Sequence, residues 1–570
     1  MLPSTLRALT LSAAVSLGLA QAPSNSLCSQ SSAGAQSNNA SYYSLVSSDG
    51  RYVVFQSNAS NLDAGDTNGT QDIYRHDLET GTTELVSRAL NGNAGNGTAV
   101  QPDLSADGRY VVWSTNASNL VSGDTNGTWD IFVRDMVLGT NLRLSVDHLG
   151  NQASARSDNP RITPDGRWII FESDAALIPA DTNGQKDVYR VDRQTGQLAL
   201  VSVTATGVQG DGWSYHGAPS HDGQRIVFTS GATTLASGDT NGQVDIFLKD
   251  MQTGALTRVN VSSGGAQANN ESTWPSISGD GGVVTYCSAA STLVTGDSNG
   301  NWDVFAYDVA TGVTTRLNVQ PNGAQANSYV RSPTGLSFDG NLVTYASLST
   351  NLVAGDTNGK QDIFVRDRAA GVTTRVSLDP SGGEVDGDCF VPHMTPDGRV
   401  VTYTSDATNI VAGDANGLRD IFAMTFDRSI GAPHCASLNQ PNSTGTQGHV
   451  TAMGSVQVAA NDVELIASEL PPHSFGLFVT SLNGTASPGP TGPTLCMSGA
   501  VGRYVAPGQV QSSGASGVIS ITLDLNATPT PTGLVQVLAG ETRYFQMWHR
   551  DFVGGSVTSN FTDALSIRFL

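Results

Sequence analysis

Residues 105–135 read SADGRYVVWSTNASNLVSGDTNGTWDIFVRD, and variants of this stretch recur seven times along the chain. In each copy an Asp-Gly turn precedes an apolar segment, a Gly-Asp-Thr-Asn-Gly loop and an Asp-Ile-Phe segment. The Asp of the turn recurs at Asp49, Asp107, Asp165, Asp222, Asp280, Asp339 and Asp397. Successive copies are 57 to 59 residues apart. A fixed period of this size indicates a propeller or a solenoid.

Each repeat predicts four short strands. In the first repeat they are expected at residues 42–47, 52–56, from Asp72 onward, and 83–87. The Asp49-Gly50 pair joins the first two, because Asp-Gly favours a tight hairpin turn. Seven units of four strands predict a seven-bladed β-propeller, in which apolar side chains fill the space between neighbouring blades.

The ring is expected to close through the N-terminus. The seventh repeat lacks a good fourth strand, whereas residues 26–50 align without a gap to residues 257–281. Residues 27–29 are therefore predicted to complete blade seven, which removes an open sheet edge. The propeller is assigned to residues 23–434, and deleting residues 23–32 is expected to lower thermal stability sharply.

The repeat resembles a known family. Its Ser-x-Asp-Gly-Arg turn, the following Val-Val-Phe and the Asp-Ile-Phe-Val-Arg-Asp segment resemble the TolB-type propeller repeat, also called the WD40-like or PD40 repeat. The resemblance covers about residues 26–430, with departures at Gly282, where Arg is expected, and at Ala180, where Gly is expected. It implies a propeller fold and, by analogy alone, an envelope role in contact with other proteins.

A second domain is expected at residues 435–570, where the repeat ends. Pro-rich turns and short alternating segments there predict an antiparallel β-sandwich, so the whole chain is assigned to the all-β class. Cys435 and Cys496 are candidates for one disulfide in this domain, and Cys28 and Cys389 for another in blade seven. Cys287 is expected to be a free thiol, although the sequence does not choose among the pairings.

Composition and the N-terminus limit the function classes. The formal net charge of −21 argues against nucleic-acid binding. The sequence has no long apolar run after the N-terminus, so no membrane span is predicted. Arg7, an apolar stretch over residues 8–20 and the small-x-small site Ala20-Gln21-Ala22, cut after Ala22, predict a signal peptide at residues 1–22. The alternative is a short buried helix. The mature protein is therefore expected to be secreted, periplasmic or on the cell surface.

The Asp-x-Asn-Gly-x-x-Asp loop is a candidate metal site. It provides three side-chain oxygens over seven residues, and hard cations such as Ca²⁺ prefer oxygen ligands. The alternative is a structural turn, in which Asp and Asn accept hydrogen bonds from loop amides. The candidate ligands are Asp66, Asn68, Asp72, Asp124, Asn126, Asp130, Asp181, Asn183, Asp187, Asp239, Asn241, Asp245, Asp297, Asn299, Asp303, Asp356, Asn358, Asp362, Asp414, Asn416 and Asp420.

Two loops differ from their counterparts in the other repeats. The segment leading into the fourth repeat carries Trp213, Tyr215 and His216, and the segment leading into the seventh carries Glu384, Asp386 and Asp388. Ligand sites often lie on such loops, so all six residues are candidate binding residues. The alternative is ordinary variation of loop sequence.

The leading hypothesis is an exported, non-enzymatic binding or scaffold protein that presents a loop face to a protein or polysaccharide partner. The sequence contains no nucleophile elbow, Walker loop or zinc-protease motif. A carbohydrate-active hydrolase or lyase is the alternative, with Glu384 and either Asp386 or Asp388 as the carboxylate pair that such an enzyme needs. A TolB-like envelope interaction module is the third.

Overall fold

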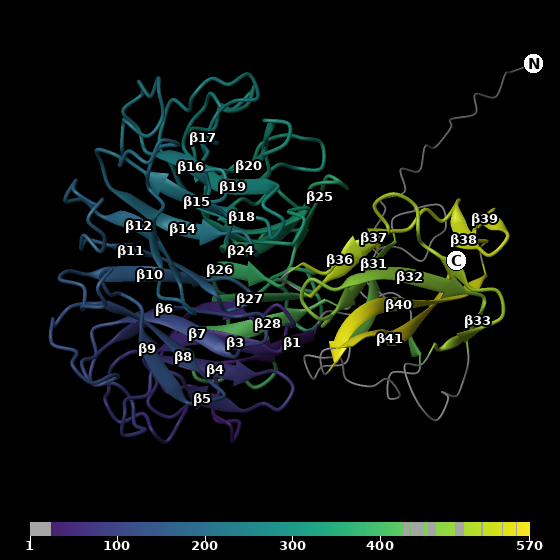
Figure 1. Cartoon of the computed structure of the whole chain (residues 1–570), viewed down its shortest axis with the longest axis horizontal. Helices are drawn as coiled ribbons and strands as arrows, with labels where there is room; N and C mark the ends of the chain where they lie inside the picture. The colour runs from purple at the N-terminus through teal and green to yellow at the C-terminus, as the bar shows by residue number, and fades with distance from the viewer. Residues whose placement is uncertain are drawn as a thin grey trace, which may run out of the picture.

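The computed structural model describes residues 24–426, 432–434, 448–453, 463–484, 495–514, 517–538, 540–553 and 556–569. Every regular element in these ranges is a β-strand (Figure 1). The strands up to residue 425 form seven four-stranded antiparallel sheets, and those from residue 432 form a separate group of sheets. The predicted signal peptide lies outside the described residues.

The seven sheets are blades of one ring. Blade one runs β2 (Ser41–Val46), β3 (Tyr52–Ser57), β4 (Asp72–Asp77) and β5 (Thr83–Leu85) from the innermost strand outward. Each inner strand contacts the inner strand of the next blade, and β2 contacts blade seven. The chain is therefore a closed seven-bladed β-propeller, as the repeat predicts.

The other blades follow the same order. Blade two is β6 (Ala99–Leu104), β7 (Tyr110–Thr115), β8 (Asp130–Asp135) and β9 (Thr140–Arg143); blade three is β10 (Ser157–Ile162), β11 (Trp168–Ser173), β12 (Asp187–Asp192) and β13 (Leu198–Leu200); blade four is β14 (Ser214–Pro219), β15 (Arg225–Ser230), β16 (Asp245–Asp250) and β17 (Leu256–Arg258). Blade five is β18 (Ser272–Ile277), β19 (Val283–Ser288), β20 (Asp303–Asp308) and β21 (Thr314–Arg316); blade six is β22 (Val330–Leu336), β23 (Leu342–Ser347), β24 (Asp362–Asp367) and β25 (Val372–Arg375).

Blade seven is completed by the N-terminal strand. It contains β26 (Cys389–Met394), β27 (Val400–Ser405) and β28 (Asp420–Thr425), and its outer strand is β1 (Ser24–Leu27). Beyond β1, the Ser29 hydroxyl donates to the buried Asp420 carboxylate and accepts from the Ile421 amide. The same two bonds join Ser87 to Asp72 and Ile73 within blade one. The N-terminal segment therefore closes blade seven as predicted, although its strand spans Ser24–Leu27 rather than residues 27–29.

Aromatic pairs fill the blades. In blade one the rings of Phe55 and Tyr74 stack with centroids 5.8 Å apart, and every other blade has a stacked aromatic pair at the same two strand positions. These side chains are fully buried, and their clusters join neighbouring blades, as where Val54 packs with Trp113. The hydrophobic core therefore runs around the whole ring.

The C-terminal strands form two antiparallel sheets. The larger contains β29 (Ala432–His434), β41 (Ser556–Arg568), β40 (Thr542–Val553), β32 (Phe475–Ser481), β35 (Gly502–Arg503) and β36 (Gln511–Ser512); the smaller contains β30 (His449–Met453), β31 (Glu464–Ser468) and β37 (Ile519–Thr522). Two short hairpins add β33 (Asn483–Gly484) with β34 (Met497–Ser498), and β38 (Thr528–Thr530) with β39 (Gly533–Val535). Both sheets contribute to one buried core, which makes this region a β-sandwich.

The start of this region differs slightly from the predicted boundary at residue 434. Because β29 pairs with β41, residues 432–434 belong to the C-terminal sheet, and the last propeller strand ends at Thr425.

The cysteines only partly follow the sequence expectation. Cys496 is disulfide-bonded, and its candidate partner Cys435 lies outside the described residues. Cys28 and Cys389 are both free and fully buried, so the expected bridge between them is wrong. Each instead fills the core of blade seven, where burial raises the pKa of its thiol far above the usual range. Cys287 is a free buried thiol, as predicted.

Candidate binding site between blades one and seven

The repeats differ at one position of the inner strand. The second residue of the inner strand is different in almost every repeat, whereas the frame around it recurs. In chain order this position holds Tyr42, Val100, Asp158, Tyr215, Thr273, Arg331 and Phe390. Since a repeat frame needs the same residues in every blade, positions that vary are free to serve recognition.

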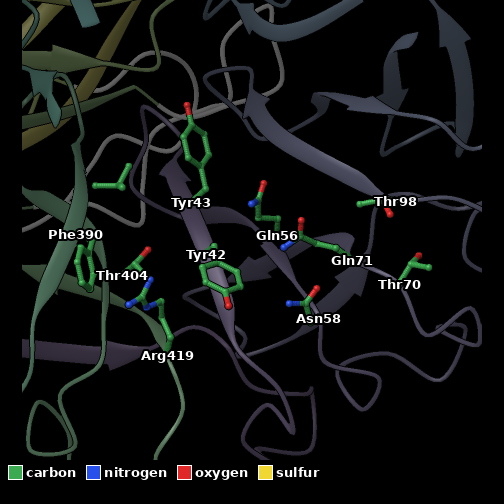
Figure 2. Close-up of a pocket in the computed structure, with 11 residues that line it drawn as sticks. Tyr42, Tyr43, Gln56, Asn58, Thr70, Gln71, Thr98, Phe390, Thr404 and Arg419 are labelled. Carbon is green, nitrogen blue, oxygen red and sulfur yellow. The ribbon is translucent and has the colours of Figure 1, made fainter. Parts of the chain in front are cut away.

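Two of these residues line a pocket between blades one and seven (Figure 2). The pocket holds about 630 Å³ and opens on the side of the ring where the long loops run. It is lined by Tyr42, Tyr43, Gln56, Asn58, Thr70, Gln71, Thr98, Phe390, Val391, Thr404 and Arg419. The binding residues predicted from the sequence lie on other segments, and none of them lines this pocket. The signal that could have found it is the variation at the inner-strand position.

Arg419 lies close to two aromatic rings of the pocket, those of Phe390 and Tyr42. The Arg419 guanidinium carbon lies 4.3 Å from the ring centroid of Phe390 and 5.6 Å from that of Tyr42. Two hydrogen bonds of 2.7 Å to the Asp406 carboxylate fix the guanidinium in place. Arginine on aromatic faces gains electrostatic attraction as well as packing. In Figure 2 Phe390, Thr404 and Arg419 face Tyr42 from the blade-seven side.

A β-bulge shapes the inner wall. In blades one to five and in blade seven the inner strand has a bulge with a non-glycine residue at positive φ, and in blade one it is Tyr43, at 52°. This conformation costs about 1–3 kcal/mol unless the surroundings favour it, and it is common at functional sites. The bulge turns the residue's amide out of the strand ladder, so that the amide can reach a side chain elsewhere.

Three blade junctions satisfy that turned-out amide with a side chain. The Gln101 amide donates to Gln56 Oε1 at 2.8 Å and the Asn159 amide to Gln101 Oε1 at 3.0 Å. The His216 amide donates to Glu172 Oε1. Gln56 and Glu172 occupy the same position of the second strand in their blades.

Blade seven has Thr404 at this position, and the shorter side chain leaves space. The Thr404 hydroxyl is buried and has no hydrogen-bond partner, and it lines the pocket together with Tyr43. Among the described residues no side chain accepts from the Tyr43 amide. The pocket therefore lies where Gln56 Oε1 and Glu172 Oε1 lie in blades one and three, whereas the remaining blades have short side chains at this position.

A charged cluster lies in blade three. Glu172 accepts from the Asn159 side chain at 2.7 Å, and Lys186 Nζ lies 3.9 Å from Glu172 and 3.0 Å from Asp158. Burial, with a smaller effect of the Asp158 charge, raises the pKa of Glu172 well above its usual range. The Glu172 side chain is only 5% exposed. This cluster links blades three and four rather than opening to solvent.

The structure brings Trp213, Tyr215 and His216 together. The ring centroids of Trp213 and Tyr215 are 4.8 Å apart, and those of Tyr215 and His216 are 4.3 Å apart. Tyr215 and His216 lie on the inner strand β14 rather than on a loop. Burial lowers the pKa of His216 to about 4, so the imidazole is neutral at physiological pH.

Glu384, Asp386 and Asp388 are each held by hydrogen bonds between loops. Glu384 accepts from the Thr357 amide at 2.7 Å and from Arg375 at 2.8 Å, and the bonds from Thr357 are the main cause that lowers its pKa to about 2. Asp386 accepts from the Thr408 amide at 2.7 Å, and Asp388 from the Gln361 amide at 2.8 Å. Each carboxylate fastens one loop to another, which supports the interpretation as loop variation.

The Asp-x-Asn-Gly-x-x-Asp loops are hydrogen-bonded turns. In blade one Asn68 Oδ1 accepts from the Thr70 amide and Asn68 Nδ2 donates to Asp72 at 2.7 Å. The corresponding Asn in every other blade accepts from the amide two residues later. Within the described ranges no group of three or more His, Cys, Asp and Glu side chains is arranged to hold a metal ion. These contacts support the turn interpretation for the loop itself.

Internal donors also face the two Asp residues of the loop in six blades. Blade five is representative: Arg316 Nη1 lies 3.3 Å from both Asp297 and Asp303. Arg143, Arg258 and Arg375 contact the corresponding Asp residues in blades two, four and six. In blades one and three a tyrosine hydroxyl, from Tyr74 or Tyr189, donates to the first Asp. At each of these six positions an arginine or a tyrosine of the same blade therefore contacts the acids.

Comparison with known proteins gives distant similarities. No family model matches the chain. An uncharacterized protein of Agrobacterium fabrum is 27% identical over 175 residues, so the match spans 30% of this chain and about half, 52%, of that protein.

Similar solved structures include several propeller-containing chains. A chain from a study of two prolyl endopeptidases aligns with a TM-score of 0.42 at 12% identity, over 79% of this chain and 56% of that one. A TolB structure from Agrobacterium tumefaciens aligns with a TM-score of 0.33 at 15% identity, over 53% and 86%. The WD40 repeats of RRP9 align with a TM-score of 0.37 at 8% identity, over 71% and 99%. The seven four-stranded blades described above are those of a seven-bladed β-propeller.

Proposed function

We propose that this chain is a non-enzymatic binding protein that takes up a segment of a protein partner in the pocket between blades one and seven. The observation that carries the proposal is the composition of the pocket. It combines two aromatic rings, a fixed arginine and a buried hydroxyl without a partner, all at positions where the repeats differ. Aromatic and arginine side chains are the residues that most often dominate binding energy at protein interfaces.

The pocket also favours a particular group on the partner. The Thr404 hydroxyl and the Tyr43 amide stand where two other blades supply a carboxamide or carboxylate oxygen of their own. A Gln, Glu, Asn or Asp side chain of the partner fits this position, because its oxygen accepts from both donors. Tyr42 and Phe390 would then cover the aliphatic part of that side chain.

Export is part of the proposal. The disulfide at Cys496 supports an oxidising compartment, where such bonds persist. Within the described part of the chain no helix is long and apolar enough to cross a membrane. We place the protein in the periplasm, on the cell surface or in the medium.

Peptide selection tests this function. A phage-displayed library of random linear peptides is selected on the immobilised full chain, and the affinity of enriched peptides is measured by fluorescence polarisation. Tyr42→Ala should weaken binding at least about tenfold, which corresponds to the loss of about 1.4 kcal/mol. Val100→Ala, at the same repeat position in blade two, is the matched control and should bind like the wild type.

A second pair of variants tests the oxygen position. Thr404→Gln should fill the pocket from within, as Gln56 does in blade one, and abolish binding while the fold is kept. Thr229→Gln makes the same change at the equivalent position in blade four and should leave the affinity unchanged. Peptides that bind Tyr42→Ala and Thr404→Gln as tightly as the wild type would overturn the proposed site. A larger loss in Tyr215→Ala would move it to blade four.

A polysaccharide partner is the second candidate. Trp274 is 40% exposed, and its ring centroid lies 6.1 Å from that of Trp302 in blade five. Exposed indole faces suit the apolar faces of sugar rings. Co-sedimentation with insoluble polysaccharides, compared between the wild type and Trp274→Ala, tests this candidate. Sugar release in the same tubes would contradict the non-enzymatic assignment.

A further inference from the structure

The residue that contacts the two Asp residues of the repeat loop follows from the strand register of each blade. In four blades the outer strand places Arg opposite a Phe of the neighbouring strand: Arg143 opposite Phe132, Arg258 opposite Phe247, Arg316 opposite Phe305 and Arg375 opposite Phe364. In the other two complete repeats the outer strand places Leu opposite Tyr: Leu85 opposite Tyr74 and Leu200 opposite Tyr189. Either the guanidinium or the phenol reaches the acids.

Blade seven breaks this rule. Its outer strand is β1, which places Leu27 opposite Phe422. This junction therefore has neither the arginine of blades two, four, five and six nor the tyrosine of blades one and three. The two acids, Asp414 and Asp420, are nevertheless retained.

In the described part of the chain, the acids of blade seven have neutral donors only. Asp414 is contacted by the Gln36 side chain and the Asn416 amide. Asp420 is fully buried and accepts from the hydroxyls of Ser29 and Ser37 and from the Asn416 side chain. Both carboxylate oxygens of Asp414, and Asp420 Oδ2, are closed to solvent. Among the described residues no Lys, Arg or His nitrogen lies within ion-pair distance of either side chain, in contrast to blades two, four, five and six.

Two neighbouring carboxylates withdrawn from solvent without a counter-charge are costly, because burial removes hydration from each charge. We propose that a hard metal cation binds between Asp414 and Asp420 and takes the place that the Arg316 guanidinium has in blade five. Oxygen donors of this kind suit Ca²⁺ or Mg²⁺, both of which also accept water ligands. The inference is independent of the proposed function.

The site lies at the point where the ring closes. Leu27 and Ser29 come from the N-terminal segment, whereas Asp414 and Asp420 come from the last repeat. A cation there would therefore stabilise the junction between the two ends of the propeller, for which the chain provides no covalent link among the described cysteines.

Thermal denaturation of the metal-free full chain tests the proposal. CaCl₂, MgCl₂ and NaCl are compared at equal ionic strength in mildly alkaline buffer, where free carboxyl groups are ionised. The wild type should show a rise in Tm of a few degrees that saturates with one of the divalent salts. The salt that acts identifies the cation, and isothermal titration calorimetry should give one site per chain.

Exchanging the two outer-strand residues provides matched variants. Leu27→Arg should supply an internal guanidinium, raise the Tm in the absence of metal and abolish the response to divalent salt. Arg316→Leu should reproduce the blade-seven arrangement in blade five and add a second binding site. If Leu27→Arg does not fold, Asp414→Asn removes one ligand with little change of shape and should also abolish the response.

Two results would overturn the proposal. One is a wild-type Tm that responds to neither divalent salt beyond the effect of NaCl. The other is a response that survives unchanged in both Leu27→Arg and Asp414→Asn, which would place the cation elsewhere.

Discussion

Removing the outer strand of blade seven should destabilise the whole propeller, although it deletes only a few residues. The perturbation is a chain that lacks residues 24–32. It loses the four residue pairs between β1 and β28, the buried Cys28 side chain and the bond from Ser29 to Asp420. Blade seven is then left with an exposed sheet edge and an underpacked core.

The size of the effect follows from these contacts. Four ladder hydrogen bonds at about 0.5–1.5 kcal/mol each, together with a buried acid that loses one donor, give a loss on the order of 5 kcal/mol. This is comparable to the entire free energy of unfolding of many domains, about 5–15 kcal/mol. For a protein of this size it corresponds to a fall in Tm on the order of 10 °C.

The assay is thermal unfolding followed by far-ultraviolet circular dichroism, with two single variants as a finer test. Ser29→Ala and Ser87→Ala remove the same hydroxyl, the first at the closure and the second within blade one. Both should lower the Tm by similar amounts, since each removes one hydrogen-bond donor from a buried Asp. A deletion that leaves the Tm unchanged, or a Ser29→Ala variant with the wild-type Tm beside a destabilised Ser87→Ala, would refute the closure.

Two further predictions concern buried groups. The protonated form of Glu172 is favoured by folding, because burial raises the pKa of Glu172 above the value of about 4.3 expected in the unfolded chain. Its contribution to stability is therefore complete in acid and is lost as the pH rises towards the folded-state pKa. The Tm of Glu172→Gln relative to the wild type should therefore rise between mildly acidic and mildly alkaline buffer. An equal difference in Tm at all pH values would contradict the assignment. Tyr74→Phe should lower stability by about 1–3 kcal/mol, because the buried Asp66 loses its donor. The hydroxyl of Tyr403 has no partner, so Tyr403→Phe is the control and should not destabilise; equal denaturant midpoints for the two variants would argue against the Asp66 bond.

The fold could be predicted from the sequence because it is encoded seven times. Any single copy, such as residues 105–135, leaves the arrangement of its strands open, but the repetition specifies the blade, and the alignment of residues 26–50 with residues 257–281 specifies the closure. The bridge expected between Cys28 and Cys389 was wrong because both residues are near blade seven but in its separate core clusters. Proximity in a blade does not determine which cluster a side chain enters.

The candidate site was harder to predict for a physical reason. Unusual loop residues such as Glu384 attract attention, yet a carboxylate can fasten a loop as well as a glutamine does. Gln152 and Gln209 make the same contact to a loop threonine amide in blades two and three. The pocket instead involves Thr404, and its position holds a long side chain in only two blades, at Gln56 and Glu172, so the residue type alone does not mark the site. Such a site depends on the space that a short side chain leaves, so it is recognised only once the neighbouring side chains are placed in three dimensions.

Hydrogen–deuterium exchange of the full chain, with and without a selected peptide, tests the central claim most directly. The account predicts that the peptide protects β2, β26 and the segments around Thr404 and Arg419, which surround the pocket. The outer strands and the C-terminal sheets should exchange as in the free protein. Protection confined to the segment around Trp213 and Tyr215, or to the C-terminal sheets, would contradict the assignment of the pocket between blades one and seven as the binding site.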